Sequence, residues 1–136
     1  MRALLTAMAR ELAASLSVPV HVCPEELLPE AATLPCVSLV DGALQVNPLA
    51  GGRREEELEA AVSCHLALHG PDQLAAADGL LEMAAQVRSA LEGNTLGLPG
   101  LIEARLVAEE PSRLSEHAGR ALISKRSLFR YLREVS

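Results

Sequence analysis

Residues 58–69, LEAAVSCHLALH, decide the fold of this chain. Apolar side chains at even positions alternate with small or polar ones at odd positions: the first set is Ala60, Val62, Cys64, Leu66 and Leu68, and the second is Glu59, Ala61, Ser63, His65, Ala67 and His69. Successive side chains of a strand point to opposite faces of a sheet, so this alternation predicts a strand with one buried and one solvated face. The following Gly70-Pro71-Asp72 predicts its end, because proline cannot donate to a strand ladder.

A long helical pattern follows this strand. Between positions 73 and 92 the apolar residues recur every three or four positions: Ala76/Ala77, Leu80, Ala84, Val87 and Leu91. Asp72 is suited to the N-cap of this helix and Gly93 to the position just past its last turn. We therefore expect a helix over 73–92, whose small alanines allow it to approach the sheet closely.

The segments before the strand predict a second helix and several short strands. Residues 2–17 carry the helical stripe Leu4, Leu5, Met8, Leu12 and Leu16. We expect strands over 20–23 and 34–40, separated by an acidic loop or single helical turn over 24–33. Asp41-Gly42 favours a hairpin, with 43–47 as its returning strand. Residues 48–54, PLAGGRR, favour a flexible loop.

The C-terminal part predicts two more strands. Residues 102–109 alternate as a half-buried strand, residues 110–119 are polar and favour a mobile hairpin loop, and residues 121–135 favour a long closing strand. The order is helix, three or four strands, helix, two strands. It predicts an α+β class: a mostly antiparallel sheet of five to six strands with two long helices packed on one face.

Length and composition favour a single α+β domain over residues 1–136, made in the cytoplasm and soluble. The chain has 136 residues, 49% of them hydrophobic, and no run of 18 apolar residues that could cross a bilayer. Its three cysteines, Cys23, Cys36 and Cys64, cannot all pair internally, and each lies in an apolar segment. We expect buried reduced thiols.

Charge is distributed unevenly along the chain. The net charge of −6 argues against a general nucleic-acid binder. Residues 1–119 carry 7 basic and 17 acidic side chains, whereas residues 120–136 carry 5 basic side chains and 1 acidic one. The last strand is therefore expected to be a basic edge on an acidic body. Its cations form either a solvated strand face or an interface that meets acidic surface on a neighbouring subunit.

The search for catalytic, metal or cofactor chemistry gives little. His65 and His69 on one strand would be about 13 Å apart, too far to share a metal ion. Cys64 and His65 are adjacent and would point to opposite faces, which disfavours a nucleophile and base pair. No phosphate-binding glycine motif occurs, and Gly51-Gly52-Arg53-Arg54 favours a charged loop over an anion site. We expect no metal and no cofactor.

Taken together, the segments resemble the small tail terminator, or tail-completion, proteins of long-tailed and Mu-like bacteriophages and prophages. The layout behind this resemblance is an N-terminal helix, LPCVSLV with a turn, a charged loop, LEAAVSCHLALHG, the helix PDQLAAADGLLEMAAQVRSAL, the linker GNTLGLPG, and the closing strand GRALISKRSLFRYLREV. The resemblance covers nearly the whole chain and rests on the order of these segments and on their residue patterns.

The resemblance implies a non-enzymatic α+β protomer that forms a ring, commonly a hexamer, on the tail tube. Its partners would be further copies of itself, the tail tube protein and a head-completion protein, with no membrane and no sequence-specific nucleic acid. It would be assembled in the host cytoplasm and reside in the phage tail. The candidate subunit interface comprises Arg53, Arg54, Arg120, Lys125, Arg126, Phe129, Arg130 and Tyr131. For the two aromatic residues, a core role or a subunit contact is favoured over a base-stacking surface.

Two other classes of function stay open on the sequence. One is a small ligand-binding regulatory domain of the same fold that acts as a dimer. The other is a hydrolase or transferase that uses His65 or His69, for which the sequence shows no partner residues.

Overall fold

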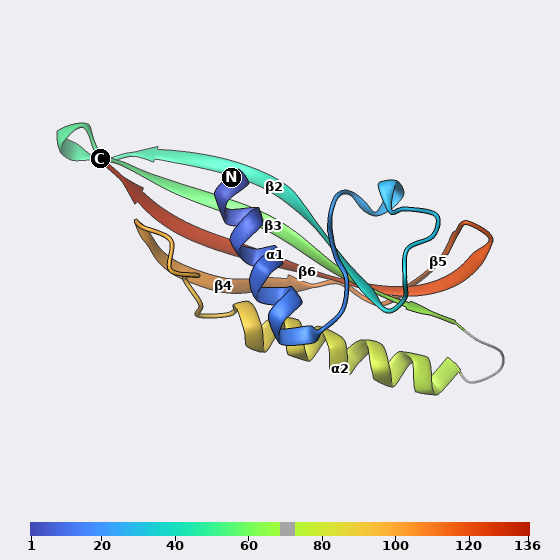
Figure 1. The fold of residues 1–136 in the computed structure, drawn as a ribbon. Helices are drawn as coiled ribbons and strands as arrows, with labels where there is room; N and C mark the ends of the chain where they lie inside the picture. Colours follow the sequence, from blue (N-terminus) through green and yellow to red (C-terminus); the bar gives the residue numbers. More distant parts are fainter. Residues whose placement is uncertain (69–72) are drawn as a thin grey trace.

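The computed structural model describes residues 1–68 and 73–136 (Figure 1). In chain order the elements are α1 (Arg2–Leu16), β1 (Val20–Val22), the short 3₁₀ helix η1 (Glu25–Leu27), β2 (Cys36–Pro48), the 3₁₀ turn η2 (Ala50–Gly52), β3 (Arg54–Ala67), α2 (Gln73–Leu91), β4 (Leu101–Glu109), β5 (Arg113–His117) and β6 (Arg120–Val135). Both predicted helices and the first predicted strand are confirmed to within one residue. The expected N-cap Asp72, His69 and the Gly70-Pro71 stop lie outside the described residues.

The strand expected from LEAAVSCHLALH lies in the middle of the sheet. The strand order is β1-β2-β3-β6-β4, and β5 also pairs with β6. The register of β3 with β6 runs without interruption from Arg54 opposite Val135 to Ala67 opposite Leu122. Among the described strands only β1 pairs in parallel, with β2. The predicted α+β class with a mostly antiparallel sheet is confirmed.

Both helices pack on the same face of the sheet, as predicted, and enclose the core (Figure 1). From α1 the core takes Leu4, Met8 and Leu12; from α2 it takes Leu80, Met83, Val87 and Leu91; from the sheet it takes chiefly Val37, Leu39, Leu58, Ala60, Val62, Cys64, Phe129 and Tyr131. The even positions of β3 from 58 to 64 thus lie in the core beneath the helices, in agreement with the sequence pattern. Gly93 follows α2 with a φ of 74°, as the expected C-terminal glycine should.

The opposite face of β3 is not solvated along its whole length, and the sequence expectation was wrong there. Ser63 and His65 are 4% and 1% exposed. The segment after η1 covers this end of the sheet: Leu28 and Ala32 are buried, and Arg120 donates hydrogen bonds to the carbonyl oxygens of Ala32 and Glu30, both at 3.1 Å. The small and polar side chains at the odd positions of this end are therefore covered by a loop and not by water.

The hairpin predicted at Asp41-Gly42 is also wrong, because β2 continues through it to Pro48. The pairing of β2 with β3 has an irregularity between Asp41 and Leu44. A Cβ atom on Gly42 would lie 3.0 Å from the Cβ of Glu59, so glycine serves close approach to β3 here, not reversal of the chain. The chain turns instead at η2, within the predicted loop 48–54, where Gly51 and Gly52 have φ angles of 76° and 75°.

Residues 110–119, expected to form a mobile loop, contain β5. This strand pairs with the first part of β6, from Arg113 opposite Ser124 to His117 opposite Arg120. β6 is long enough to pair with β4 along one half and with β5 along the other. An exposed edge strand needs no apolar alternation, so the polar sequence concealed it.

Two edges of this sheet carry no strand on their outer side in the part of the chain that the structure describes. β1 covers β2 only over positions 37–39, which leaves residues 41–48 of β2 uncovered. On the other side, β4 is the last strand of the order. Figure 1 shows the β2–β3 turn and the C-terminus together at one end of the molecule, with α2 beginning at the other.

The close approach at Gly42 can be tested by comparison with its neighbour. Gly42→Val should lower the free energy of unfolding by about 1–3 kcal/mol, because the added side chain meets Glu59 within the strand pair. Ala43→Val, on the adjacent exposed position of the same strand, should change it by less than about 0.5 kcal/mol. Urea unfolding followed by circular dichroism measures both; equal effects of the two substitutions would contradict the close-approach argument.

Candidate functional site

The C-terminal strand does not form the basic edge that the charge distribution suggested. β6 lies inside the sheet, with β3 on one side and β4 and β5 on the other. A sequence can show that a strand is basic, but strand order depends on pairing between segments far apart in the chain. The expectation of an edge position is therefore wrong.

The cations of β6 meet acidic or carbonyl groups of the same protomer. Arg130 pairs with Glu59 at 3.0 Å, and Arg133 pairs at 3.1 Å with Glu56, whose side chain is 7% exposed. The Nζ of Lys125 donates to the carbonyl oxygen of Glu110 at 2.9 Å. These contacts balance the acidic β3 against the basic β6 within one chain.

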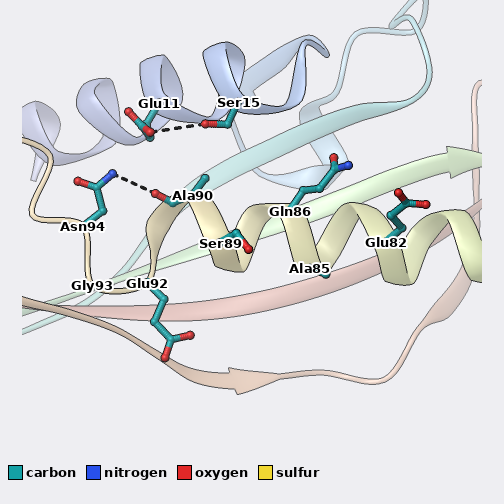
Figure 2. Close-up of a pocket in the computed structure, with 10 residues that line it drawn as sticks. All are labelled: Glu11, Ser15, Glu82, Ala85, Gln86, Ser89, Ala90, Glu92, Gly93 and Asn94. Carbon is teal, nitrogen blue, oxygen red and sulfur yellow. Dashed lines mark hydrogen bonds between the residues drawn. The ribbon is translucent and has the colours of Figure 1, made fainter.

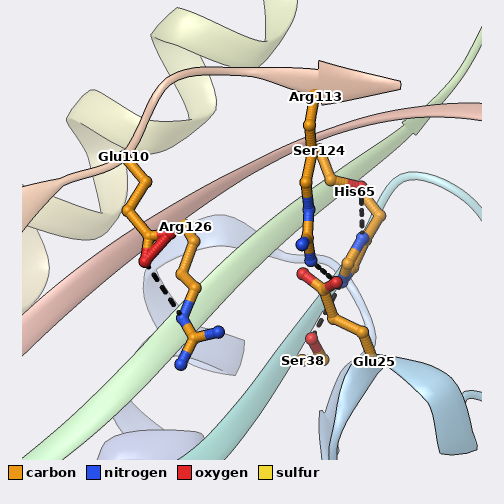
Figure 3. Close-up of polar contacts among 7 residues, drawn as sticks. All are labelled: Glu25, Ser38, His65, Glu110, Arg113, Ser124 and Arg126. Carbon is orange, nitrogen blue, oxygen red and sulfur yellow. Dashed lines mark hydrogen bonds and ion pairs between the residues drawn. The ribbon is translucent and has the colours of Figure 1, made fainter. Parts of the chain in front are cut away.

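Arg126 has a looser partner. Its Nε lies 3.7 Å from Oε1 of Glu110 (Figure 3), within ion-pair range but too long for a hydrogen bond. This Nε is buried and has no hydrogen-bond partner among the described residues. The contact of Arg120, Lys125, Arg126 and Arg130 with another subunit remains a prediction.

The other expected interface residues divide into a buried and an exposed pair. Phe129 and Tyr131 are 0% exposed and lie in the core, which is the first of the two roles that the sequence favoured. Burial raises the pKa of the Tyr131 hydroxyl. By contrast, Arg53 and Arg54 lie at the β2–β3 turn with side chains 55% exposed, Arg53 contacting Glu134 at 2.9 Å and Arg54 contacting Glu56 at 3.7 Å.

A polar cluster lies under the loop on the face opposite the helices (Figure 3). His65 Nε2 is 2.8 Å from the hydroxyl of Ser38, and Nδ1 is 2.7 Å from the hydroxyl of Ser124. These residues come from β3, β2 and β6, so the cluster links the three longest strands. Burial, with smaller contributions from His117 and His21, lowers the pKa of His65 to about 4. The imidazole is therefore neutral at pH 7, and each serine hydroxyl can complement either ring nitrogen.

Next to this cluster is a cavity of about 450 Å³ between η1 and β5, with His65 in its wall. Arg113 and Glu25 form an ion pair beside it (Figure 3). Ser38 and His65 have the spacing of a nucleophile and a base, but they are 3% and 1% exposed. The group on the other ring nitrogen is a serine hydroxyl rather than a carboxylate. The arrangement is suited to linking β2, β3 and β6 through hydrogen bonds.

The cysteines, like the His65 cluster, lie in positions that favour a structural role. The three thiols are free; Cys36 and Cys64 are buried and Cys23 is half-buried. Burial raises the pKa of Cys36 to about 11 and that of Cys64 to about 12, so both are protonated at neutral pH. Cys64 belongs to the core on the helix-covered face, whereas His65 belongs to the serine cluster, which agrees with the expected opposite orientation of the two side chains.

A shallow groove of about 690 Å³ separates the two helices (Figure 2). Glu11, Glu82 and Glu92 contribute carboxylates to its walls. Asn94 Nδ2 donates to the carbonyl oxygen of Ala90 at 3.0 Å and so caps the end of α2. Within the described ranges, no group of three or more His, Cys, Asp or Glu residues could hold a metal ion, and no helix is long and apolar enough to span a membrane.

Sequence reasoning missed the exposed apolar side chains along the two edges of the sheet. Leu44 and Val46 of β2 are each 51% exposed, and Ile102 of β4 is 56% exposed. In the sequence these residues resembled ordinary strand positions. A segment without charge, ALQVN at 43–47, was the available signal, but its meaning depends on the strand order.

Comparisons with known proteins give a shared fold. No protein-family model matches the chain, and no curated protein matches it. Among solved structures the chain is similar to one from the "Virion of native gene transfer agent (GTA) particle", with a TM-score of 0.64 and 22% sequence identity. The likeness covers 97% of this chain and 95% of that one. At this identity it shows that the two chains have the same fold.

The buried histidine predicts how stability depends on pH. The unfolded chain takes up a proton on His65 near pH 6.5, whereas the folded chain does so only near pH 4. Stability is therefore lost as the pH falls through this window, by roughly 2–3 kcal/mol at pH 4.5 from this residue. His65→Gln keeps a neutral polar side chain that does not titrate, so its stability should fall less between pH 7 and 4.5.

Urea unfolding of both proteins at the two pH values measures this difference. Carboxylates that titrate in the same window are common to both proteins and cancel in the comparison. Parallel losses of stability in the wild type and in His65→Gln would contradict the assignment.

Proposed function

We propose that this protein is a structural component of a phage-like particle, a tail terminator that forms a ring on the end of the tail tube and joins it to the head. The observation that carries the proposal is the shared fold with a chain of a gene transfer agent virion, which covers almost all of both chains. The element order, which resembled tail terminator proteins in the sequence, supports it further.

The surface of the protomer is compatible with this role. A cyclic ring needs two different patches on each subunit, one for each neighbour. Strands β2 and β4 lie on opposite sides of the sheet, and each carries exposed apolar side chains, Val46 on one and Ile102 on the other. The proposed partners are further copies in a hexamer, the tail tube protein and a head-completion protein. Assembly in the host cytoplasm and residence in the tail follow from the same proposal, and no catalytic step is part of it.

Removal of the gene from particle-producing cells tests the proposal directly. If the ring caps the tube and joins it to the head, its loss should give tails of uncontrolled length that carry no heads. Negative-stain electron microscopy measures tail length and the fraction of tails joined to heads. Supplying the wild-type gene in trans should restore both, and normal particles in its absence would refute the proposal.

The exposed arginines at the β2–β3 turn allow a second test, on the purified protein. The chain carries a net charge of −6, so its exposed cations are suited to meet acidic surface on a neighbour. Arg53→Glu/Arg54→Glu should weaken self-association roughly tenfold, and added salt should weaken that of the wild type. Sedimentation velocity over a range of concentrations measures both.

Arg10→Glu, a charge reversal on the exposed surface of α1, is the matched control. Association that is unaffected by the turn variant would exclude these two arginines from the interface. A fixed dimer at all concentrations, stabilised by a small molecule, would instead favour a ligand-binding regulatory domain.

A further inference from the structure

The part of the chain around the β2–β3 turn extends beyond the packed body of the protomer. Every residue from 41 to 54 is exposed, and Figure 1 shows this turn at one end of the molecule. We call residues 44–54 the β2–β3 tip. The rest of the described chain leaves both faces of this tip accessible to another molecule.

The β2–β3 tip carries apolar and cationic side chains together. Leu44 and Val46 are each 51% exposed and Leu49 is 39% exposed. Burial of such side chains is favourable when two surfaces meet. Arg53 and Arg54 follow, with side chains 55% exposed. Their ion pairs within the protomer involve exposed guanidinium groups, and pairs of this kind contribute little to stability, so both cations can turn to carboxylates of another molecule.

The groove between α1 and α2 has the opposite charge. Glu11 lines it from α1, Glu82 lines it from α2, and Glu92 lines it from the residue after α2 (Figure 2). Among the described residues, none of these three carboxylates forms an ion pair. The groove can therefore accept cations from outside without breaking an existing ion pair.

The groove also matches the tip in shape and in apolar surface. The turn of the tip, Ala50–Gly52, has no bulky side chain. Two exposed leucines lie seven positions apart on one face of α2, Leu74 at 74% and Leu81 at 53% exposure, and Leu81 is next to Glu82 of the groove. The groove itself is lined from α2 partly by small side chains, namely Ala85, Ser89 and Ala90.

We propose that the β2–β3 tip of one copy docks into the groove between α1 and α2 of the next copy. Arg53 and Arg54 then lie against Glu82 and Glu92, and the apolar side chains of the tip cover Leu81. The occupant is a second copy because this chain supplies both the cations and the apolar side chains that complement the groove.

This inference rests on the proposed ring and names its subunit contact. The tip lies at one end of the protomer and the groove lies on its helical side (Figure 1). The contact therefore joins two different surfaces, which is the kind of contact that repeats from subunit to subunit around a ring.

Mixing two charge-reversed proteins tests the docking. The tip variant is Arg53→Glu/Arg54→Glu, and the groove variant is Glu82→Arg/Glu92→Arg. Each alone should self-associate roughly tenfold more weakly than the wild type, because like charges then face each other in every contact. In an equimolar mixture the two variants alternate and every contact again joins opposite charges, so the wild-type affinity should return. Sedimentation velocity measures association, and circular dichroism confirms that each variant folds.

The matched control reverses two exposed carboxylates away from the groove, as Glu30→Arg/Glu116→Arg. This control should associate as the wild type does, and it should not restore the tip variant. A mixture of tip and groove variants that stays as weak as each variant alone would overturn the docking. So would a wild-type protein that stays monomeric at every concentration.

Cysteine crosslinking gives a second measurement that does not depend on charge. Ala50→Cys on the tip and Ser89→Cys in the groove are introduced separately, each with Cys23→Ser, since the other two native cysteines are buried. A short bis-maleimide should crosslink the two proteins in a mixture and neither protein alone. Leu27→Cys, at an exposed position in η1, replaces Ala50→Cys as the control and should give no crosslink. No crosslink in the first mixture would overturn the docking.

Failure of the docking and failure of the proposed function are distinguishable. If tails lose their length control and their heads without the gene, while mixing restores no affinity and no crosslink forms, the ring stands and this contact is wrong. If particles are normal without the gene, the proposed function fails irrespective of the mixing and crosslinking results.

Discussion

The pairing of β3 with β6 is the constraint on which the rest of the structure depends. Fourteen residues of each strand lie in one unbroken antiparallel register. This register places Leu58 and Ala60 beside Tyr131 and Phe129 in the core, and it places Glu59 beside Arg130 on the other face. A slip of one residue would move every side chain of one strand to the opposite face and separate these pairs. Apolar burial and charge pairing therefore select the same register, and β2, β4 and β5 are positioned by it.

Residue patterns predicted the parts of the fold that depend on local periodicity. Leu80, Ala84, Val87 and Leu91 recur at helical spacing and are buried, and the even positions of β3 from 58 to 64 lie in the core. The errors occurred where the outcome depends on a distant segment. Gly42 was predicted to be a turn residue because no local pattern shows that Glu59 of β3 lies against it. β5 was missed because its own residues carry no strand pattern, and only its pairing with β6 defines it. His65 resembled a solvated histidine because no local pattern shows that residues 28–32 cover it.

The candidate interface was harder to predict, for a related reason. The sequence shows how many arginines the C-terminal strand carries, but not that Glu59 and Glu56 lie opposite two of them. Once these acids pair with the cations, the local excess of positive charge no longer identifies a surface for a neighbour. By contrast, Val46 and Ile102 were overlooked in the sequence, although both are exposed. Each looked like part of a normal strand, and only the strand order shows that neither has a further strand beside it on its outer side among the described residues.

The sheet therefore has two ends with different roles. At the end that contains His65, β1 lies beside β2, β5 lies beside β6, and the loop after η1 covers the face opposite the helices. The buried, hydrogen-bonded His65 joins three strands there, so this end is completed by the chain itself. At the other end no described strand pairs with residues 41–48 of β2 on their outer side, whereas the linker after α2 contacts the outer edge of β4, where the N–H of Gly93 donates to the carbonyl oxygen of Ala104 at 2.8 Å. The uncharged residues 43–47 of β2 are thus the part of the sheet edge that the described chain leaves without a strand partner, and free backbone groups of this kind favour pairing with another strand.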